Sequence, residues 1–194
     1  MTLDVGKGDA LLVVDVQRDF LPGGNLAVHE GDAVVPVLNR YIDLARKKGL
    51  PILASRDWHP ERHCSFKEQG GPWPPHCVAD TPGAQFPKDL QLPPGTVVID
   101  KATRPEVDAY SAFSGTTLAD RLRALGVKRV LIGGLTTDYC VVNSVRDALR
   151  EGFEVVVLAD AIRAVNVNPD DGENAQREMW SRGAVPARYE DLAA

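Results

Sequence analysis

Three of the four histidines in the chain lie in one short region that also contains aspartate and cysteine. The stretch "RDWHPERHCSF", residues 56–66, holds an aspartate, two histidines and a cysteine, and "WPPHC", residues 73–77, adds a histidine and a cysteine. Imidazole, carboxylate and thiolate groups are ligands of zinc and other transition metals. The region therefore predicts a metal site, against the alternative of surface histidines that bind no metal.

A metal site here could be open and reactive, or closed and structural. Asp57 and His59 lie at the end of a predicted strand, and His63 and His76 could reach in from the loop. One carboxylate and two imidazoles from this set, with other positions open, are typical of a reactive site. The alternative is a structural zinc held by two adjacent pairs: His63, Cys64, His76 and Cys77. Adjacent residues do not easily aim at one ion, and the C-x-x-C spacing of zinc knots is absent, so the open site is favoured.

A second set of reactive residues follows apolar runs that are typical of buried strands. Asp15 follows "LLVV", Asp57 follows "PILAS" and Lys101 follows "TVVID". The segment "LTTDYC", which ends at Cys140, follows "RVLIGG". Ligands bind beyond the carboxyl ends of parallel strands, so we expect these groups to meet at one edge of a sheet. Taken singly, each has an ordinary explanation as a turn cap, an exposed charge or a small buried hydrophobe.

The types of residue at this edge indicate acyl transfer. Cys140 lies in the first turn of a helix expected to begin near Asp138, where free amides and the helix dipole predict a lowered thiol pKa and can stabilise an oxyanion. Asp15 would be the base for the thiol and the acid for the leaving group, with Lys101 holding its carboxylate in place. The predicted chemistry is attack on an amide-like carbonyl, a thioester and its hydrolysis. A cysteine–histidine pair of the protease type is not expected, because His29 is the one histidine outside the loop.

The elements that would position these residues alternate between strands and helices. Compact apolar runs predict strands at residues 10–16, 51–55, 96–100, 129–134 and 153–160, and a short one near Val185. Helical spacing of apolar residues predicts helices at 32–48, 116–126 and 139–151, and a polar helix at about 169–182. Such alternation implies right-handed crossovers and parallel pairing. We therefore expect one three-layer α/β/α domain over residues 1–194, with a mainly parallel sheet.

One interval, about 57–94, interrupts the alternation. It is rich in proline and has no good helical pattern. Irregular segments of this length inside a compact domain are usually functional or disordered. Trp58, Phe66 and Trp73 would be unusual residues in a flexible tether. We therefore expect an ordered loop, organised by a bound metal.

Composition and charge exclude several classes of function. A chain of 194 residues is near the upper edge of a single domain. The net charge of −5, without a Lys/Arg run, argues against nucleic acid or an anionic membrane surface as a partner. The longest apolar stretch is too short to cross a bilayer, and "MTLDVGKGD" does not resemble a secretory signal. Three cysteines are an odd number and do not form a disulfide framework, so we expect a reduced, cytoplasmic protein.

Five stretches of the chain resemble the nicotinamidases of the isochorismatase-like cysteine hydrolases, which also act on pyrazinamide. They are "VVDVQRDFLPGGNLAV", "RDWHPERHCSF", "GGPWPPHCVADTPGAQF", "DKATRPEVDAYSAF" and "GGLTTDYCVVNSVRDALREGFEV", and they span nearly the whole length. The resemblance implies a metal-dependent amidohydrolase of NAD salvage. Such an enzyme converts nicotinamide to nicotinate and ammonia through a cysteine thioester.

The resemblance also implies roles for residues near the nucleophile. Asp15, Lys101 and Cys140 correspond to the catalytic triad. The bond between Leu135 and Thr136 corresponds to a cis peptide. The amides of Thr136 and Cys140 would then form the oxyanion hole.

The resemblance further implies a metal site and a pocket for the substrate ring. Asp57, His59 and His76 correspond to ligands of one divalent ion, which could be zinc, iron or manganese. His63 would be a further ligand or a neighbour that supports the others. In the family the metal binds the pyridine nitrogen and so orients the carboxamide. The expected lining of the ring pocket is Phe20, Trp73 and Tyr110, against the alternative of simple core packing.

Two rival functions remain beside this one. A hydrolase of ureides or other linear amides would need no ring-binding metal, which the histidine loop argues against. A zinc-stabilised binding domain would have no catalytic activity.

Two residues depart from the pattern of the family. Relatives often carry alanine at the position of Thr136, and Arg104 is expected near the pocket mouth. Both departures affect the expected range of substrates and not the type of reaction. The expected partner is a small-molecule substrate. Self-association is common among relatives, so a homo-oligomer is compatible with the sequence.

Overall fold

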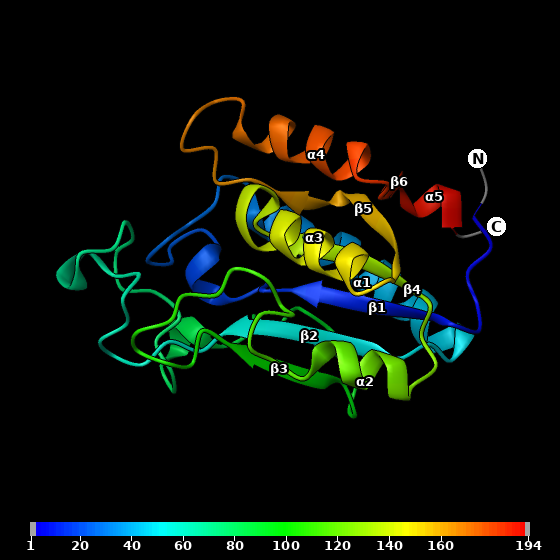
Figure 1. Cartoon of the computed structure of the whole chain (residues 1–194), viewed down its shortest axis with the longest axis horizontal. Helices are drawn as coiled ribbons and strands as arrows, with labels where there is room; N and C mark the ends of the chain where they lie inside the picture. The colour runs from blue at the N-terminus through cyan, green and yellow to red at the C-terminus, as the bar shows by residue number, and fades with distance from the viewer. Residues whose placement is uncertain (1–2, 193–194) are drawn as a thin grey trace.

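A computed structural model describes residues 3–192, which contain a six-stranded parallel sheet covered by helices (Figure 1). The strand order is β3-β2-β1-β4-β5-β6. The strands are β1 (Asp9–Val14), β2 (Ile52–Asp57), β3 (Val97–Lys101), β4 (Arg129–Leu135), β5 (Glu154–Arg163) and β6 (Val185–Ala187). Every described pair is parallel, so the predicted α/β/α class with a mainly parallel sheet is confirmed.

Helices cover both faces of the sheet. They are α1 (Val34–Lys48), α2 (Leu118–Ala124), α3 (Val142–Arg150), α4 (Asp171–Ser181) and α5 (Tyr189–Leu192). Apolar side chains of α1 and α5 pack with Leu11 and Val13 of β1, whereas those of α2, α3 and α4 pack with Leu12 and Val14. Alternate residues of a strand point to opposite faces, and helices cover both faces here. β1 is therefore buried along its whole length, which is why its sequence is one apolar run. None of the helices within residues 3–192 is long and apolar enough to span a membrane.

The predicted elements differ from the structure mainly at their ends. Asp57 and Lys101 are the last residues of β2 and β3 rather than the residues beyond them. Helix α3 begins at Val142 instead of residue 139, because Thr137–Val141 form a wider π-helical turn. The short helix α5 was not predicted.

Strand β4 passes unusually close to β1 just before the site. Gly134 has φ of +129°, and a Cβ there would lie 2.1 Å from the carbonyl oxygen of Val14. Only glycine fits such a position, since an L side chain would meet backbone that cannot move away. Gly134 therefore lets β1 and β4 deliver Asp15 and Thr136 to neighbouring positions.

The predicted irregular loop is ordered and lies beyond the carboxyl ends of β1, β2 and β3 (Figure 1). It contains only two short 3₁₀ turns, Lys67–Gln69 and Pro82–Ala84. Isolated bridges join His59 to Val78 and Phe66 to Trp73. Phe66 is completely buried, so the loop has an apolar centre of its own.

Candidate active site

The site lies where the order of the strands reverses. β1 pairs with β2 on one side and with β4 on the other, and the chain crosses from β3 back to β4. Asp15 directly follows β1, while Asp57 and Lys101 are register partners at the ends of β2 and β3. Cys140 lies in the turn after β4. The four strand ends meet as the sequence predicts, because ligand sites of open parallel sheets form at such a reversal.

Lys101 makes contact with each of the other reactive groups. Its Nζ lies 2.5 Å from Oδ1 of Asp57, 3.0 Å from Oδ2 of Asp15 and 3.5 Å from Sγ of Cys140. It also donates to the carbonyl oxygen of Ala109 at 3.0 Å. Burial favours the neutral amine, but Asp15 and Asp57 outweigh it and hold the pKa of Lys101 well above its usual value. The ammonium is therefore charged.

The two carboxylates at this site differ in their protonation behaviour. Burial, with a contribution from Asp57, raises the pKa of Asp15 against the opposing effect of Lys101. The hydroxyl of Ser55 donates to Asp15 Oδ1 at 2.6 Å. Burial also works against ionisation of Asp57, but Lys101, His59 and His76 outweigh it and lower the pKa of Asp57. Asp15 is thus the carboxylate that accepts a proton more readily.

The thiol of Cys140 does not have the lowered pKa that its place at a helix start predicts. Burial raises its pKa well above the usual value, Lys101 opposes this, and Asp15 and Asp57 add to it. The side chain is buried and lies close to two carboxylates. Both features disfavour the thiolate, and together they outweigh the start of the helix, which favours it. Asp15, Asp57 and Cys140 each place a ligand atom within 4.8 Å of the others, so the thiol proton has a nearby acceptor.

The turn that carries Cys140 is built around Thr136. Its carbonyl oxygen accepts hydrogen bonds from the amides of Tyr139 at 3.2 Å and Val141 at 2.9 Å. The peptide bond between Leu135 and Thr136 is cis, as the resemblance led us to expect. Thr136 and Cys140 are both buried and lie on the same wall of the site.

Asp57 is shared with a second cluster that fits a divalent metal. Ligand atoms of Asp57, His59 and His76 all lie within 4.8 Å of one another. Nδ1 of His59 is 2.9 Å from the carbonyl oxygen of His76, and Nδ1 of His76 is 2.8 Å from that of Pro74. Each ring thereby keeps Nε2 for a ligand bond, and the backbone carbonyls orient it. Burial lowers the pKa of His59 to about 4, so this imidazole is neutral, as a ligand must be.

His63 lies beside this cluster but uses both ring nitrogens elsewhere. Nδ1 is 2.8 Å from Oγ of Ser65, and Nε2 is 3.1 Å from the carbonyl oxygen of Val107. A further grouping of His59, His63 and Asp108 is geometrically close, but Asp108 is exposed. Among the clusters found in residues 3–192, none includes Cys64 or Cys77, so the closed structural zinc is not supported.

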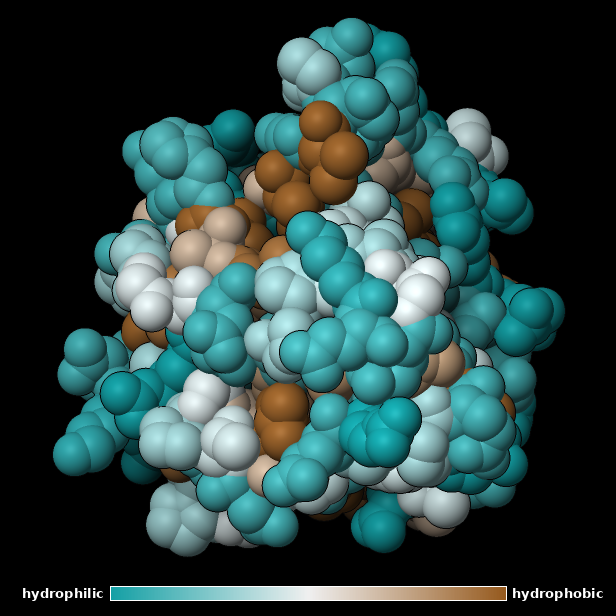
Figure 2. Space-filling view, turned by 90° about the vertical axis from the view of Figure 1, so that its left-hand side faces the viewer, coloured by the Kyte–Doolittle hydropathy of each residue, from teal (hydrophilic) through white to brown (hydrophobic). Residues whose placement is uncertain are grey.

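A cleft with aromatic walls connects Asp57 and His76 with Cys140. It is lined by Phe20, Leu26, Asp57, Trp73, His76, Tyr110, Thr136, Tyr139, Cys140 and Val165. Trp73 donates its indole N–H to the hydroxyl of Tyr110 at 3.0 Å, and the ring of Tyr139 meets Trp73 edge-on at 5.0 Å. Figure 2 looks onto this side of the molecule and shows small apolar patches among polar side chains. A flat, mostly apolar ring with a polar substituent suits such walls.

Some residues of the site were not predicted from the sequence. Tyr139, the neighbour of Cys140 in "LTTDYC", lines the cleft and could have been found from that adjacency. Gln17 is completely buried and holds Asp57: its amide donates to the Asp57 carbonyl at 2.8 Å, and its own oxygen accepts from the Asp57 amide at 2.8 Å. A lone glutamine gives no signal of this role in the sequence. Arg104 is exposed and is not among the residues that line the cleft.

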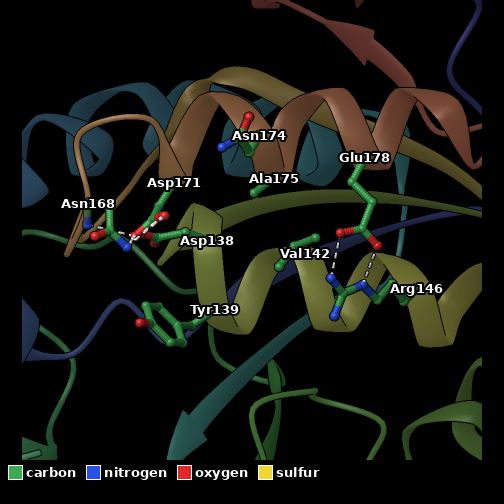
Figure 3. A pocket seen from close by; sticks show the side chains of 9 residues that line it. All are labelled: Asp138, Tyr139, Val142, Arg146, Asn168, Asp171, Asn174, Ala175 and Glu178. Atoms are coloured by element: carbon green, nitrogen blue, oxygen red, sulfur yellow. Dashed lines mark hydrogen bonds and ion pairs between the residues drawn. The ribbon is translucent and has the colours of Figure 1, made fainter.

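A second depression lies next to the cleft, between α3 and α4 (Figure 3). Asp138 accepts hydrogen bonds there from the amides of Val165 and Asn166, at 2.9 and 2.8 Å. Arg146 of α3 and Glu178 of α4 form a two-bond ion pair at 2.6 and 2.5 Å. These contacts tie the 165–166 loop and α4 to the segment that carries Cys140.

Comparisons with known proteins identify relatives of this chain. The family profile described as "Isochorismatase domain" matches residues 9–191. The nicotinamidase of Escherichia coli K12 is 42% identical, and the alignment covers 91% of this chain and 92% of the relative. The crystal structure of a Pyrococcus horikoshii pyrazinamidase in complex with zinc is 53% identical, with a TM-score of 0.90 over 94% of this chain and 99% of that one. PnC1 from L. infantum, in complex with nicotinate, is 35% identical with a TM-score of 0.90, covering 99% and 98% of the two chains.

Proposed function

This chain belongs to the isochorismatase family, and we propose that it is an amidohydrolase that converts nicotinamide to nicotinate and ammonia. The observation that carries the proposal is the position of Lys101 Nζ, within 3.5 Å of Cys140 Sγ and within 3.0 Å of Asp15. Asp57, the second carboxylate that contacts Lys101, also belongs to the cluster of possible metal ligands. A cleft that joins a nucleophile to a metal position suits a ring with a carboxamide on it better than a linear amide.

The first half of the reaction forms a thioester. As the sulfur of Cys140 attacks the carboxamide carbon, Asp15 accepts the thiol proton. Negative charge develops on the carboxamide oxygen, and the amides of Thr136 and Cys140 donate hydrogen bonds to it. Asp15 then passes the proton to the nitrogen, the C–N bond breaks and ammonia leaves.

The second half restores the enzyme. Water attacks the thioester carbon while Asp15 accepts a proton from it. The C–S bond breaks, Asp15 returns its proton to the sulfur of Cys140, and the nicotinic acid formed loses its remaining proton to water and leaves as nicotinate. Lys101 holds Asp15 in place throughout, and its positive charge offsets the negative charge that develops beside it.

The ring is held by the loop and the cleft walls. A divalent ion bound by Asp57, His59 and His76 would supply a Lewis-acidic position for the pyridine nitrogen, which orients the carboxamide. Zinc, iron and manganese all suit one carboxylate and two imidazoles. Phe20, Trp73 and Tyr110 cover the ring without requiring hydrogen bonds from it. Pyrazinamide, a flat ring with the same carboxamide, is a second substrate.

The proposed substrate, nicotinamide, is small and uncharged, which is consistent with the domain organisation, cellular location and partners that we infer. We infer that residues 1–194 act as one hydrolase domain, with the loop at about 57–94 as its metal-binding part. It works in the cytoplasm on free nicotinamide, in the salvage of NAD, without nucleic acid or membrane partners, and self-association is compatible with this role.

Ammonia release tests the proposal. The purified protein, supplied in turn with zinc, iron(II) or manganese, is expected to release ammonia from nicotinamide, and Cys140→Ala should release none while keeping its circular dichroism spectrum. Benzamide, which lacks the ring nitrogen, should react far more slowly, and linear ureides should not react. Absence of ammonia with every metal, or full activity of Cys140→Ala, would overturn the assignment. Faster turnover of a ureide would favour the linear-amide hydrolase.

A further inference from the structure

Thr136 carries a buried hydroxyl for which the described residues offer no hydrogen-bond partner. The residue is 3% exposed and lines the cleft that also contains Cys140 and the aromatic side chains. Buried hydroxyls are almost always hydrogen-bonded, because a group that leaves water without finding a partner raises the free energy of the folded state. Because Thr136 lines the cleft, a partner for its hydroxyl can arrive with the ligand.

The position of this hydroxyl is well defined. The carbonyl oxygen of Thr136 accepts from the amides of Tyr139 and Val141, which fixes the residue at the start of the turn that carries the nucleophile. Its φ of −103° and ψ of 147° lie in the extended region. A β-branched side chain on a fixed backbone has few rotamers, so little freedom is lost when it forms a hydrogen bond.

We propose that the Thr136 hydroxyl is a further catalytic group, which donates a hydrogen bond to the carboxamide oxygen while negative charge develops on it. This rests on the proposed amidohydrolase function. The carboxamide oxygen gains charge as the sulfur of Cys140 attacks, so a donor at that atom binds the transition state more strongly than the ground state. A hydroxyl that accepted from the carboxamide nitrogen would instead bind both states about equally.

Three substitutions separate the hydroxyl from the bulk of the side chain. Thr136→Val keeps the shape and removes the hydroxyl, Thr136→Ser keeps the hydroxyl and removes a methyl group, and Thr136→Ala removes both. Loss of one donor to a developing oxyanion lowers kcat by about 100- to 1,000-fold. Thr136→Val and Thr136→Ala should both show this loss with little change in KM, whereas Thr136→Ser should stay within about 3-fold of the unsubstituted enzyme.

Inhibition by nicotinaldehyde gives a second readout that does not depend on turnover. The thiol of Cys140 adds to the aldehyde carbon, its proton moves to Asp15 or to the new oxygen, and that oxygen occupies the place of the tetrahedral intermediate's oxygen. Thr136→Val should bind nicotinaldehyde more weakly by about the factor lost in kcat. Circular dichroism and thermal melting establish that each variant is folded.

The outcomes distinguish this role from the function on which it depends. Full kcat in Thr136→Val, a loss in Thr136→Ser as large as in Thr136→Val, or a rise in KM alone would each overturn the donor role. In all three cases the unsubstituted protein still releases ammonia, so the amidohydrolase function stands. An unsubstituted protein that releases no ammonia overturns both.

Discussion

At the scale of single residues, the charge of the buried site determines how its chemistry can proceed. Lys101 is paired with two carboxylates, so the site has one negative charge in excess while the thiol is neutral. Buried charge is costly unless it is paired, which favours the neutral thiol and raises the pKa of Cys140. Transfer of the thiol proton to Asp15 leaves the total charge unchanged. We therefore expect the thiolate of Cys140 to form during the attack rather than beforehand.

The two histidines beside Asp57 have different roles, which metal analysis can separate. His59 keeps Nε2 for a ligand bond, whereas both ring nitrogens of His63 are hydrogen-bonded. We expect His59→Ala to lose at least about ten-fold in metal affinity, and His63→Ala to retain close to one ion per chain. The measurement is elemental analysis of each variant after loading with zinc and desalting.

The two variants serve as matched controls, since both remove a buried imidazole from the same loop. If His63→Ala loses as much metal as His59→Ala, His63 is a ligand and its ring must turn away from Ser65 and Val107 when metal binds.

At the scale of elements, the site depends on how α3 and α4 hold the turn after β4. Arg146 of α3 pairs with Glu178 of α4, and Arg182, the residue directly after α4, pairs with the same carboxylate (Figure 3 shows the first pair). The turn that carries Cys140 leads directly into α3. The ion pairs therefore stabilise the helix layer behind Cys140.

The Glu178 contacts predict a pH dependence of stability. The hydrogen bond with Arg146 is the main cause that lowers the pKa of Glu178 from 4.5 to about 2. A lowered pKa in the folded state contributes stability above pH 4.5, and this contribution is lost as the pH falls toward 2. The side chains are partly exposed, so we expect Glu178→Gln to cost no more than about 1 kcal/mol near pH 7.

Urea unfolding of both proteins between pH 7 and pH 3 checks this. The difference in the free energy of unfolding should be largest at neutral pH and should shrink as the pH falls below 4.5. A difference that stays constant over the whole range would show that the carboxylate charge does not contribute.

At the scale of the whole molecule, one site connects the sheet to the irregular loop. Asp57 ends β2, whereas His59 and His76 belong to the loop that follows it. A metal on these three residues would tie the loop to the sheet edge. The aromatic residues Trp73 and Phe20 then face the cleft from the loop and from the segment after β1.

Removal of the metal should therefore loosen the loop and lower the stability of the protein. A metal that binds only the folded state, at a free concentration of 100 times its Kd, adds about 2.7 kcal/mol to the free energy of unfolding. We expect a chelator to lower the Tm of the zinc-loaded protein and to speed proteolysis within residues 60–75. Added zinc should reverse both effects.

His59→Ala provides the control, because a variant without a metal ligand should respond little to the chelator. An equal fall in Tm in this variant would mean that the chelator acts elsewhere than on this cluster.

The sequence alone determined the elements and the types of chemistry available. Apolar runs and helical spacing are local properties, so "LLVV", "RVLIGG" and the helices around the sheet could be predicted without any contact being known. Strand ends, and the Asp, Lys and Cys residues at them, could be read in the same way. The resemblance to a known family then indicated which of these residues correspond to the catalytic triad, the metal ligands and the ring pocket.

Only the tertiary structure decided the distances and the environments. That Lys101 lies between Asp15 and Asp57 depends on the strand order and on the close approach at Gly134, which involve residues far apart in the chain. Burial, a property of the packed molecule, raises the pKa of Cys140, where helix position alone predicts the reverse. The unpaired hydroxyl of Thr136 is likewise visible only when every neighbour is in place, because hydrogen bonding depends on geometry and not on residue type.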